Sequence, residues 1–448
     1  PQWQRAAQQR LAGALRGAIL SDGANYEGAL GYHAAYAFWP QRVVDAARFA
    51  GLPLDDEIRR TYERKRLAAV ELWAKVATPG RTLPPMGDCW PHSVTEALKR
   101  HGATFGSPMA IAVAGDDPAR WPAQKSFFLP QMRYAVMRSG WQRDALWCGF
   151  NLRGFHYGHD HYDLLHLEVQ AGDVRLLPDS GCIDYGANRE RSRATCAHNA
   201  LVVDGRNQGP GPAADIRWHT APHFDWAEGL SLAHEGLLHR RAVCFLKPDA
   251  FLVLDRLDFR ARGVRQCDFF WHLPADRQTH FAERAVRTTG DGWNLALDFA
   301  CGPDWNVIRE TGFLATTYLS WINAPVARLS ATPAFGFNVA ALIRPIRSGT
   351  ELHAAWQIER LPILWYNAGD GEPIPEGRGI GVIVRRPDCV NHILWSDPGY
   401  GEKRVGEWSS DGELLLTHEQ TGKPPIALAR QASLVMRSGV EQQWLMVS

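Results

Sequence analysis

The sequence predicts a multidomain α+β protein in which helices come first and antiparallel strands follow. Apolar residues recur every three or four positions near the start, while short alternating apolar runs separated by turn residues dominate after about Lys125. With 448 residues, 45% of them hydrophobic and 22% charged, the chain can build two or three cores. We predict a helical domain over 1–125, a β-sandwich domain over 126–365 and a smaller β domain over 366–448. The last boundary rests on the Gly-, Pro- and Glu-rich stretch 369–377.

The helical prediction rests on apolar stripes and on residues that start or stop helices. One stripe consists of Trp3, Ala7, Leu11, Leu15 and Ile19. A second helix runs from Ile58 to Val76 and is ended by Pro79-Gly80. A third starts at Ser93, where Glu96 completes a capping box, and ends at Gly102. Between the first two, residues 34–50 are helix-like but interrupted by Pro40.

The strand prediction starts from a hairpin. Leu165, Leu167 and Val169 alternate, Gly172-Asp173 turns the chain, and residues 174–177 return. Further strands are expected at 201–203, 251–254, 268–271, 295–299, 339–343, 379–384, 393–395, 414–417 and 444–447. So many short strands predict a large antiparallel sandwich.

Charge and hydropathy exclude two classes of partner. The 49 basic and 48 acidic residues leave a net charge of +1 without a basic stripe, so nucleic-acid binding is not indicated. No apolar run approaches the roughly 18 residues of a membrane span.

Because the chain starts at Pro1 without a methionine, we expect that its beginning was cut by processing or truncation. A signal peptide could have preceded it, and we expect a periplasmic or secreted protein.

The residues that carry chemistry gather between 155 and 207. His159, His161 and Asp163 alternate, and on a strand such residues point to one face. Imidazole and carboxylate ligands suit zinc, whereas the eight cysteines contain no C-x-x-C pair for a four-thiolate site. From spacing alone, the alternative is that the H-x-H pair is a surface or core feature and not a pair of metal ligands.

Several motifs resemble, in the right order, those of heparinase II/III-like polysaccharide lyases. The matching segments are Asp22-Gly-Ala-Asn-Tyr-Glu27, Gly31-Tyr-His33, Leu83-Pro-Pro-Met-Gly-Asp88, the H-x-H-x-D run, Pro178-Asp-Ser-Gly181, Ala197-His-Asn199 and Val202-Val-Asp-Gly205. The resemblance covers residues 22 to 208, and beyond about residue 210 only the β-rich character is shared.

The resemblance implies an incomplete (α/α) toroid, an antiparallel β-supersandwich and a small C-terminal β domain. It implies that His161, Asp179 and His198 bind a structural zinc ion, and that Tyr32 and His159 are catalytic. The family also places an Asn or His against the substrate carboxylate, from a helix well before the tyrosine. The 31 residues before Tyr32 contain no counterpart, so we expect that the chain is a fragment or that another chain completes the toroid.

The implied reaction is β-elimination on a uronic-acid poly- or oligosaccharide. Hydrogen-bond donors neutralise the sugar carboxylate, a base removes the C5 proton, and an acid protonates the departing C4 oxygen. Tyr32 is expected to be the acid, and also the base in syn geometry. His159 is expected to be the base in anti geometry, or otherwise to neutralise the carboxylate.

Other residues are expected to bind substrate, each with a structural alternative. Trp90 and Tyr185 could stack on or bond to sugar, and His33 follows the catalytic tyrosine, although a structural role for His33 is the stronger alternative. Among the arginines at 189, 191 and 193, Arg193 is expected to meet an anionic sugar.

Three other functions stay open from the sequence: a glycoside hydrolase, a non-catalytic glycan-binding protein and a metal-dependent hydrolase. A hydrolase of the first kind would need two carboxylates roughly 5 to 10 Å apart, whereas the strongest cluster here is of histidines. The polymer is equally open, because alginate, heparan-type and hyaluronan-type chains all contain uronic acids. The oligomeric state is not indicated.

Overall fold

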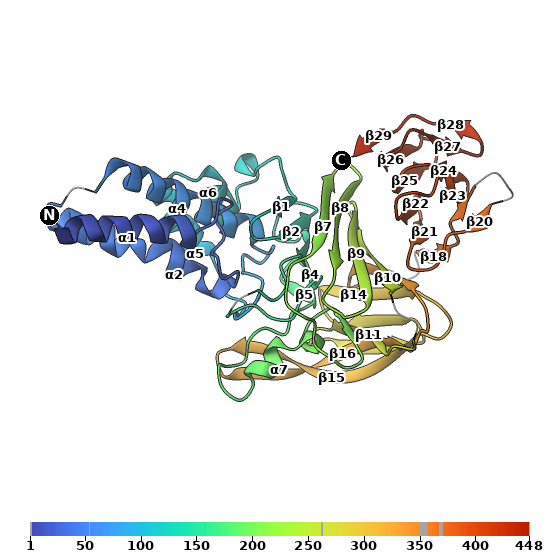
Figure 1. Cartoon of the computed structure of the whole chain (residues 1–448), viewed down its shortest axis with the longest axis horizontal. Helices are drawn as coiled ribbons and strands as arrows, with labels where there is room; N and C mark the ends of the chain where they lie inside the picture. Colours follow the sequence, from blue (N-terminus) through green and yellow to red (C-terminus); the bar gives the residue numbers. More distant parts are fainter. Residues whose placement is uncertain are drawn as a thin grey trace.

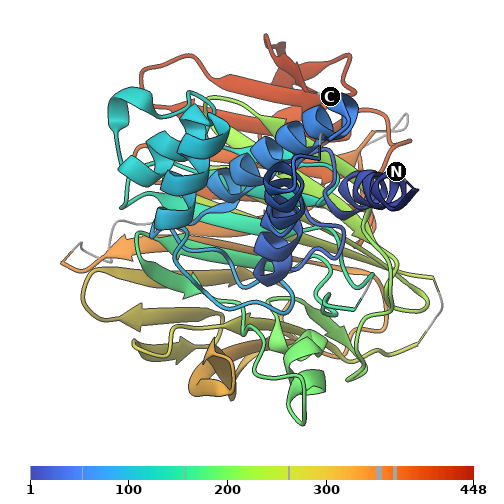
Figure 2. The same ribbon diagram turned by 90° about the vertical axis from the view of Figure 1, so that its left-hand side faces the viewer.

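The computed structural model describes residues 2–52, 54–156, 158–260, 263–349, 356–366 and 371–447. It confirms a multidomain α+β protein, with helices at one end and the C-terminal strands at the other (Figure 1). Seen from the helical end, the helices lie in front of the sheets (Figure 2). Among the described residues, no helix is long and apolar enough to cross a membrane.

The helices occupy the first part of the chain, as predicted. They are α1 (Gln2–Ala18), α2 (His33–Phe38), α3 (Pro40–Phe49), α4 (Asp56–Val76), α5 (Thr95–Phe105) and α6 (Pro108–Gly115), with 3-10 turns η1 (Leu30–Tyr32) and η2 (Pro118–Arg120). Helix α4 is the central one, because it contacts α1, α2, α5 and α6. Asp55 caps its start by accepting from the Glu57 and Ile58 amides at 2.8 and 3.4 Å.

Two helix predictions need correction. The stripe on α1 is buried only from Leu11 onward, and Trp3 is 86% exposed. Helix α5 begins at Thr95 without a side-chain cap and continues past Gly102 to Phe105, where the left-handed Gly106 ends it. Gly102 stays helical because its missing side chain lets Ala110 and Ile111 of α6 approach closely.

The first sheet lies between the helices and the main β core. Its strands are β1 (Phe127–Leu129), β2 (Tyr134–Arg138), β3 (Leu146–Asn151), β4 (Leu167–Ala171) and β5 (Val174–Leu177), paired in chain order. The predicted hairpin is confirmed as β4–β5, with its turn at Gly172. One face of this sheet packs on α4, and the other faces the main core.

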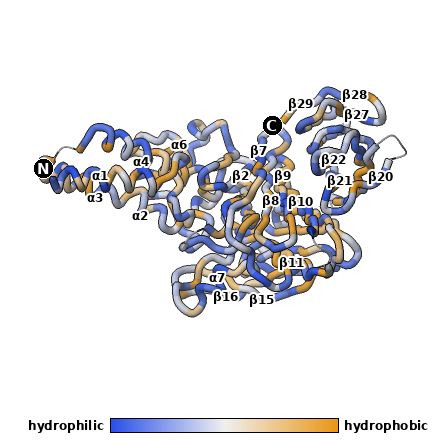
Figure 3. The backbone as a smooth tube through the Cα atoms, viewed as in Figure 1, coloured by the Kyte–Doolittle hydropathy of each residue, from blue (hydrophilic) through white to orange (hydrophobic). Residues whose placement is uncertain are grey.

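The main core lies between this sheet and two others, one of eight strands and one of four. The first has the order β12-β13-β14-β17-β10-β9-β8-β7 and the second β15-β16-β11-β6, and hydrophobic segments concentrate where they meet (Figure 3). The bounds are β6 (Leu201–Val203), β7 (Ala214–Thr220), β8 (Phe224–Ser231), β9 (Leu237–Leu246), β10 (Ala250–Phe259), β11 (Cys267–His272), β12 (Gln278–Ala282), β13 (Ala285–Thr289), β14 (Trp293–Ala300), β15 (Asn306–Thr317), β16 (Ser320–Ala331) and β17 (Phe337–Arg347). Each strand predicted between 201 and 343 lies in one of these.

Two further sheets form the C-terminal part, in the orders β18-β21-β22-β25-β26-β29 and β20-β19-β23-β24-β27-β28. The bounds are β18 (Gln357–Leu361), β19 (Leu364–Trp365), β20 (Glu372–Pro373), β21 (Gly379–Arg385), β22 (Cys389–Ser396), β23 (Lys403–Val405), β24 (Trp408–Ser410), β25 (Leu414–Gln420), β26 (Ile426–Arg430), β27 (Val435–Arg437), β28 (Val440–Glu441) and β29 (Leu445–Val447). Because β18 pairs with β21, this part includes residues before the predicted boundary at 366. Residues 369–370 of the proposed boundary stretch lie outside the described residues.

Candidate functional site

Three loops meet where the helices join the β core: the segment before α2, the Pro85–Trp90 loop and the loop after residue 157. The Asp88 amide donates to the His159 carbonyl at 3.0 Å. Gly87 allows this contact, because it has a φ of +64° and an added Cβ would lie 2.6 Å from the His159 oxygen. Gly31 is equally confined, with a hypothetical Cβ 2.7 Å from the Asp88 carbonyl. The glycine of the Pro-Pro-Met-Gly-Asp motif thus has a steric reason.

The buried carboxylate of Asp88 holds two histidines. His159 Nδ1 donates to its Oδ2 at 2.7 Å, and His161 Nε2 donates to its Oδ1 at 3.0 Å. Burial alone would raise the pKa of Asp88, but the hydrogen bonds and charges of the two histidines outweigh it and lower that pKa. Asp88 is therefore ionised and fixes both rings. The side chain of His159 remains 23% exposed, whereas His161 is buried.

Tyr32 and Tyr185 lie against His159. The Tyr32 ring stacks on the imidazole with centroids 4.1 Å apart, and its hydroxyl lies 2.6 Å from the Tyr185 hydroxyl. Burial and the hydrogen bond with Tyr32 raise the pKa of Tyr185, so Tyr185 keeps its proton at neutral pH. All three side chains are partly exposed. The structure thus brings together Tyr32 and His159, which come from separate motifs, with Tyr185, which was predicted to bind sugar.

Glu27 and Arg189 complete this group and were not predicted for it. Glu27 Oε2 lies 3.6 Å from His159 Nε2. Arg189, at the start of α7 (Arg189–Arg193), places Nη2 3.7 Å from Asp88 Oδ2 and its guanidinium 5.3 Å from the Tyr185 ring centre. Its Nε is buried, with no hydrogen-bond partner among the described residues. The Glu27 signal was present, because that residue ends the first matching motif.

Trp90 and Tyr318 form an aromatic border beside Tyr185. Their rings are nearly perpendicular at 5.9 Å, and Tyr318 lies 6.1 Å from the Tyr185 ring. Tyr318 belongs to the two-residue tip between β15 and β16, a long hairpin that the sequence analysis missed. Backbone hydrogen bonds from Ala315 and Leu319 to the 180–183 loop hold this tip in place.

The H-x-H-x-D run does not lie on a strand, so the prediction that its alternating side chains point to one face of a strand is wrong. Residues 158–166 form a loop between β3 and β4. His159 and His161 converge instead because Asp88 binds both. The third residue, Asp163, is buried, which raises its pKa to about 6.

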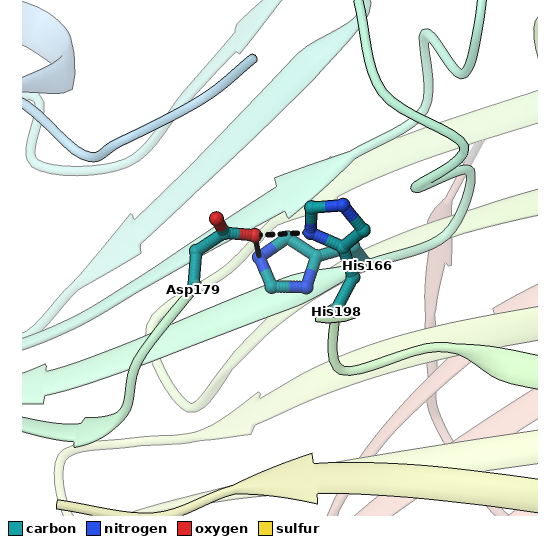
Figure 4. A group of neighbouring side chains, drawn as sticks. All are labelled: His166, Asp179 and His198. Atoms are coloured by element: carbon teal, nitrogen blue, oxygen red, sulfur yellow. Dashed lines mark hydrogen bonds and ion pairs between the residues drawn. The ribbon is translucent and has the colours of Figure 1, made fainter. Parts of the chain in front are cut away.

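A second cluster lies next to His161, in the interior. His166, Asp179 and His198 bring one ligand atom each within 4.8 Å of one another (Figure 4). Asp179 Oδ2 accepts from His198 Nδ1 at 2.6 Å and lies 3.2 Å from His166 Nε2. The predicted ligand His161 is not in this group, although its ring lies 5.2 Å from the His198 ring.

Hydrogen bonds indicate which of these nitrogens can bind a metal ion. The Asn199 amide donates to His166 Nδ1 at 2.8 Å, so a neutral His166 carries its proton on Nε2 and has no lone pair there. His161 and His198 use their N–H groups toward carboxylates, which leaves the lone pairs of His161 Nδ1 and His198 Nε2 available. Both atoms are buried without a partner in the described structure. His161 Nδ1 and His198 Nε2 are therefore the nitrogens that have a lone pair free for a metal ion, and imidazole is a ligand type that suits zinc.

Two predicted substrate-binding residues are not brought to this group. His33 is buried and donates from Nε2 to the Ala69 carbonyl at 3.1 Å, and burial lowers its pKa to about 4. Arg193 pairs with Glu190 at 3.2 Å and lies 4.9 Å from the Phe155 ring. The arginine at the site is Arg189, one helical turn earlier.

Comparisons with known proteins match most of the chain. The family model for the heparinase II/III N-terminus matches residues 1–111, and the model for the heparinase II/III-like C-terminal region matches residues 122–320. A heparin-sulfate lyase of Pedobacter heparinus is 22% identical over 339 residues, which cover 72% of this chain and 51% of the relative. One of Bacteroides stercoris is 21% identical over 342 residues, covering 71% and 50%. The chain thus spans about half the length of these curated relatives.

Solved structures show the same fold. A heparinase III superposes with a TM-score of 0.76 at 18% identity, covering 89% of this chain and 62% of that one. A mutant of the heparan sulfate lyase from Pedobacter heparinus gives 0.74 at 20% identity, with the same two coverages.

Proposed function

Because the chain belongs to the heparinase II/III-like family, we propose that it is a polysaccharide lyase that cleaves uronic-acid glycans by β-elimination. The contact that joins Tyr32, Tyr185 and the Asp88-held His159 carries the proposal. It provides a proton acceptor and a proton donor side by side, as removal of the C5 proton and release of the C4 oxygen require. Heparan-type glycans are the first substrates to test, since the curated relatives are named heparin-sulfate lyases.

His159 is the base in this proposal. Its Nδ1–H is engaged by Asp88, so the neutral ring has its lone pair on Nε2, the atom that can accept the C5 proton. The carboxylates of Asp88 and Glu27, 2.7 and 3.6 Å away, stabilise the imidazolium that forms.

Tyr32 is the acid. When its proton passes to the departing C4 oxygen, the phenolate needs a hydrogen-bond donor. Tyr185 supplies one at 2.6 Å, because its raised pKa keeps it protonated. In syn geometry the same Tyr32 oxygen can first accept the C5 proton.

Arg189 is the residue that we propose for the sugar carboxylate or sulfate. Its side chain is partly exposed beside Tyr185, and its Nη2 is held by donation to the Gly158 carbonyl at 2.9 Å. Neutralising the carboxylate makes the C5 proton more acidic, because the negative charge of the developing enolate is then stabilised. We also infer that α1 to α6 are part of an incomplete (α/α) toroid, which the match of residues 1–111 supports.

We propose that His161 and His198 hold one structural zinc ion, with Asp179 either as a third ligand or as the acceptor that orients His198. Such an ion would supply a crosslink between the His159 loop and the β core. Burial would lower the pKa of His198, but Asp179 outweighs this and raises it, so a proton competes with zinc at low pH.

Ultraviolet absorbance of the unsaturated uronate end tests the lyase proposal. The protein is incubated with heparan sulfate, hyaluronan and alginate, and both absorbance and new reducing ends are followed. Elimination gives both signals together. New reducing ends without absorbance would indicate a hydrolase, and binding without either signal would indicate a glycan-binding protein.

A further inference from the structure

A groove at the helical end is lined by arginines and lies outside the site described above. It has a volume of about 1070 Å³ and lies between α3, the first half of α4 and the end of α5. Its cationic lining consists of Arg48, Arg59, Arg60, Arg64, Arg66 and Arg100. Glu63 is the only carboxylate among the described residues that line it.

The positive charge of this groove is mostly uncompensated. Arg59 pairs with Asp56 and Glu63 at 3.2 and 3.3 Å. Within the described part of the chain, the other five arginines form no ion pair with a carboxylate. Arg60 and Arg64 are one turn apart on α4, where like charges repel and destabilise a helix. Such an arrangement disfavours the free protein and favours binding of an anion.

Arg66 is the strongest indication of a ligand. It is only 3% exposed and is held by the Phe105 ring at 3.7 Å, and one amino group donates to Gln41 and Tyr62. Its Nε is buried with no partner among the described residues. Burial lowers the pKa of Arg66, and the charge of Asp45 offsets this only in part, so a bound anion would further stabilise the buried cation.

We propose that this groove binds an acidic oligosaccharide, as a second glycan site separate from Tyr32 and His159. Arginine forks bind carboxylate and sulfate groups in pairs of hydrogen bonds, and repeated anionic groups along a sugar chain suit several arginines in one groove. Leu52, Leu54 and Phe105 add apolar surface for the faces of sugar rings. The choice of a glycan as the anion rests on the proposed function.

The groove is separated from the catalytic candidates by packed rings. His101 in the groove stacks on Phe38 at 3.8 Å, and Phe38 contacts Trp73 at 5.1 Å. Trp73 contacts His33 at 5.2 Å, next to Tyr32 in sequence. An oligosaccharide in the groove therefore contacts different residues from one at His159.

Hydrogen exchange measured by mass spectrometry can locate the binding. A heparin-derived octasaccharide is added to the full chain carrying Tyr32→Phe, so that it is not cut. Peptides covering 56–67 and 98–105 should become protected. In the same background, the double substitution Arg60→Ala, Arg64→Ala removes two charge-assisted contacts. The octasaccharide concentration that gives half of the maximal protection should then rise by about tenfold or more. Arg206→Ala with Arg385→Ala removes the same charge from exposed β-half positions and should leave it unchanged.

Absence of protection in these peptides, or equal protection in the Arg60/Arg64 variant, would overturn the proposal. Equal protection by single-stranded DNA of matched charge would also overturn it, by showing a general polyanion surface. The readout needs no cleavage. A chain that fails to cleave any uronan but shows the expected protection would therefore lose the lyase proposal and keep this one.

Discussion

The site around Asp88 and the arginine groove between α3 and α5 balance their charges in opposite ways. At the site, buried or half-buried carboxylates lie within 4 Å of each histidine and of Arg189. In the groove, five arginines have no such partner in the described part of the chain. Internal pairing fixes geometry before substrate arrives, whereas unpaired charge favours an external anion. This difference is the reason why we propose chemistry at the first region and binding at the second.

The largest effect is expected for Tyr32→Phe at the site around Asp88. This substitution removes the hydroxyl that carries the proton and keeps the aromatic ring. Turnover should fall by about 10²- to 10⁴-fold, the usual contribution of a positioned acid or base. Tyr185→Phe removes only the supporting hydrogen bond and should cost less. Initial rates of absorbance increase measure both, with thermal melts to show that the fold is kept. A Tyr32→Phe enzyme near the wild-type rate would refute the assignment.

Asp88→Asn tests whether internal pairing sets the geometry. An amide leaves one of the two histidine N–H groups without an acceptor, so turnover should fall by about 10- to 100-fold. The melting temperature should also fall, because an unsatisfied buried group costs about 1–3 kcal/mol. Asp173→Asn, in the exposed turn after Gly172, is the control and should change neither. Unchanged turnover in Asp88→Asn would mean that His159 is oriented by other contacts.

The zinc content of variants shows whether His161, the predicted ligand, or the neighbouring His166 binds the ion. His161→Ala should lose the ion and melt at a lower temperature, since a ligand at about 100 times its dissociation constant contributes about 2.7 kcal/mol. His166→Gln should retain it, because His166 has no free lone pair toward the cluster. His159→Ala should also retain it while losing activity. Elemental analysis gives the answer, and the opposite result for His161 and His166 would assign the site to the His166 cluster.

The smallest effect is expected for the stability of the Arg60→Ala, Arg64→Ala variant without ligand. Removing one i, i+4 like-charge pair should leave the free energy of unfolding unchanged or raise it by about 0.2–0.5 kcal/mol. Denaturant unfolding measures this change. A clear loss of stability would show that these arginines stabilise the helix, which would contradict the uncompensated charge inferred for the groove.

The parts of the fold that the sequence predicted are those set by local periodicity. Helix α4 buries Ile58, Tyr62 and Trp73 as their spacing requires, and β4–β5 turns at Gly172. The β15–β16 hairpin was missed because much of it is exposed, including Trp321 at 40% and Ile322 at 47%, so apolar alternation does not mark a buried face.

The contact between Tyr32 and His159 agrees with their prediction from two motifs, whereas the role of Asp88 could not be predicted although a motif contains it. Tyr32 and His159 were named in advance, and their rings are in contact. The role of Asp88 depends on how its loop folds against residues 158–161, which no spacing in the sequence reveals. Arg193 was preferred over Arg189 without a way to see that Glu190 and Phe155 already engage it.

The tip of the β15–β16 hairpin gives the surface beside Tyr185 an evolutionary freedom that Asp88 lacks. Tyr318 and Leu319 link two strands that pair over residues 306–330, so the Tyr318 side chain can be exchanged without altering the sheet or the hydrogen bond from Leu319 to the 180–183 loop. Asp88, by contrast, is constrained by two histidines and by the glycine that precedes it. Under the proposed lyase function, descendants of this chain can therefore acquire new substrate preferences at the tip and keep the chemistry proposed for the Asp88 site.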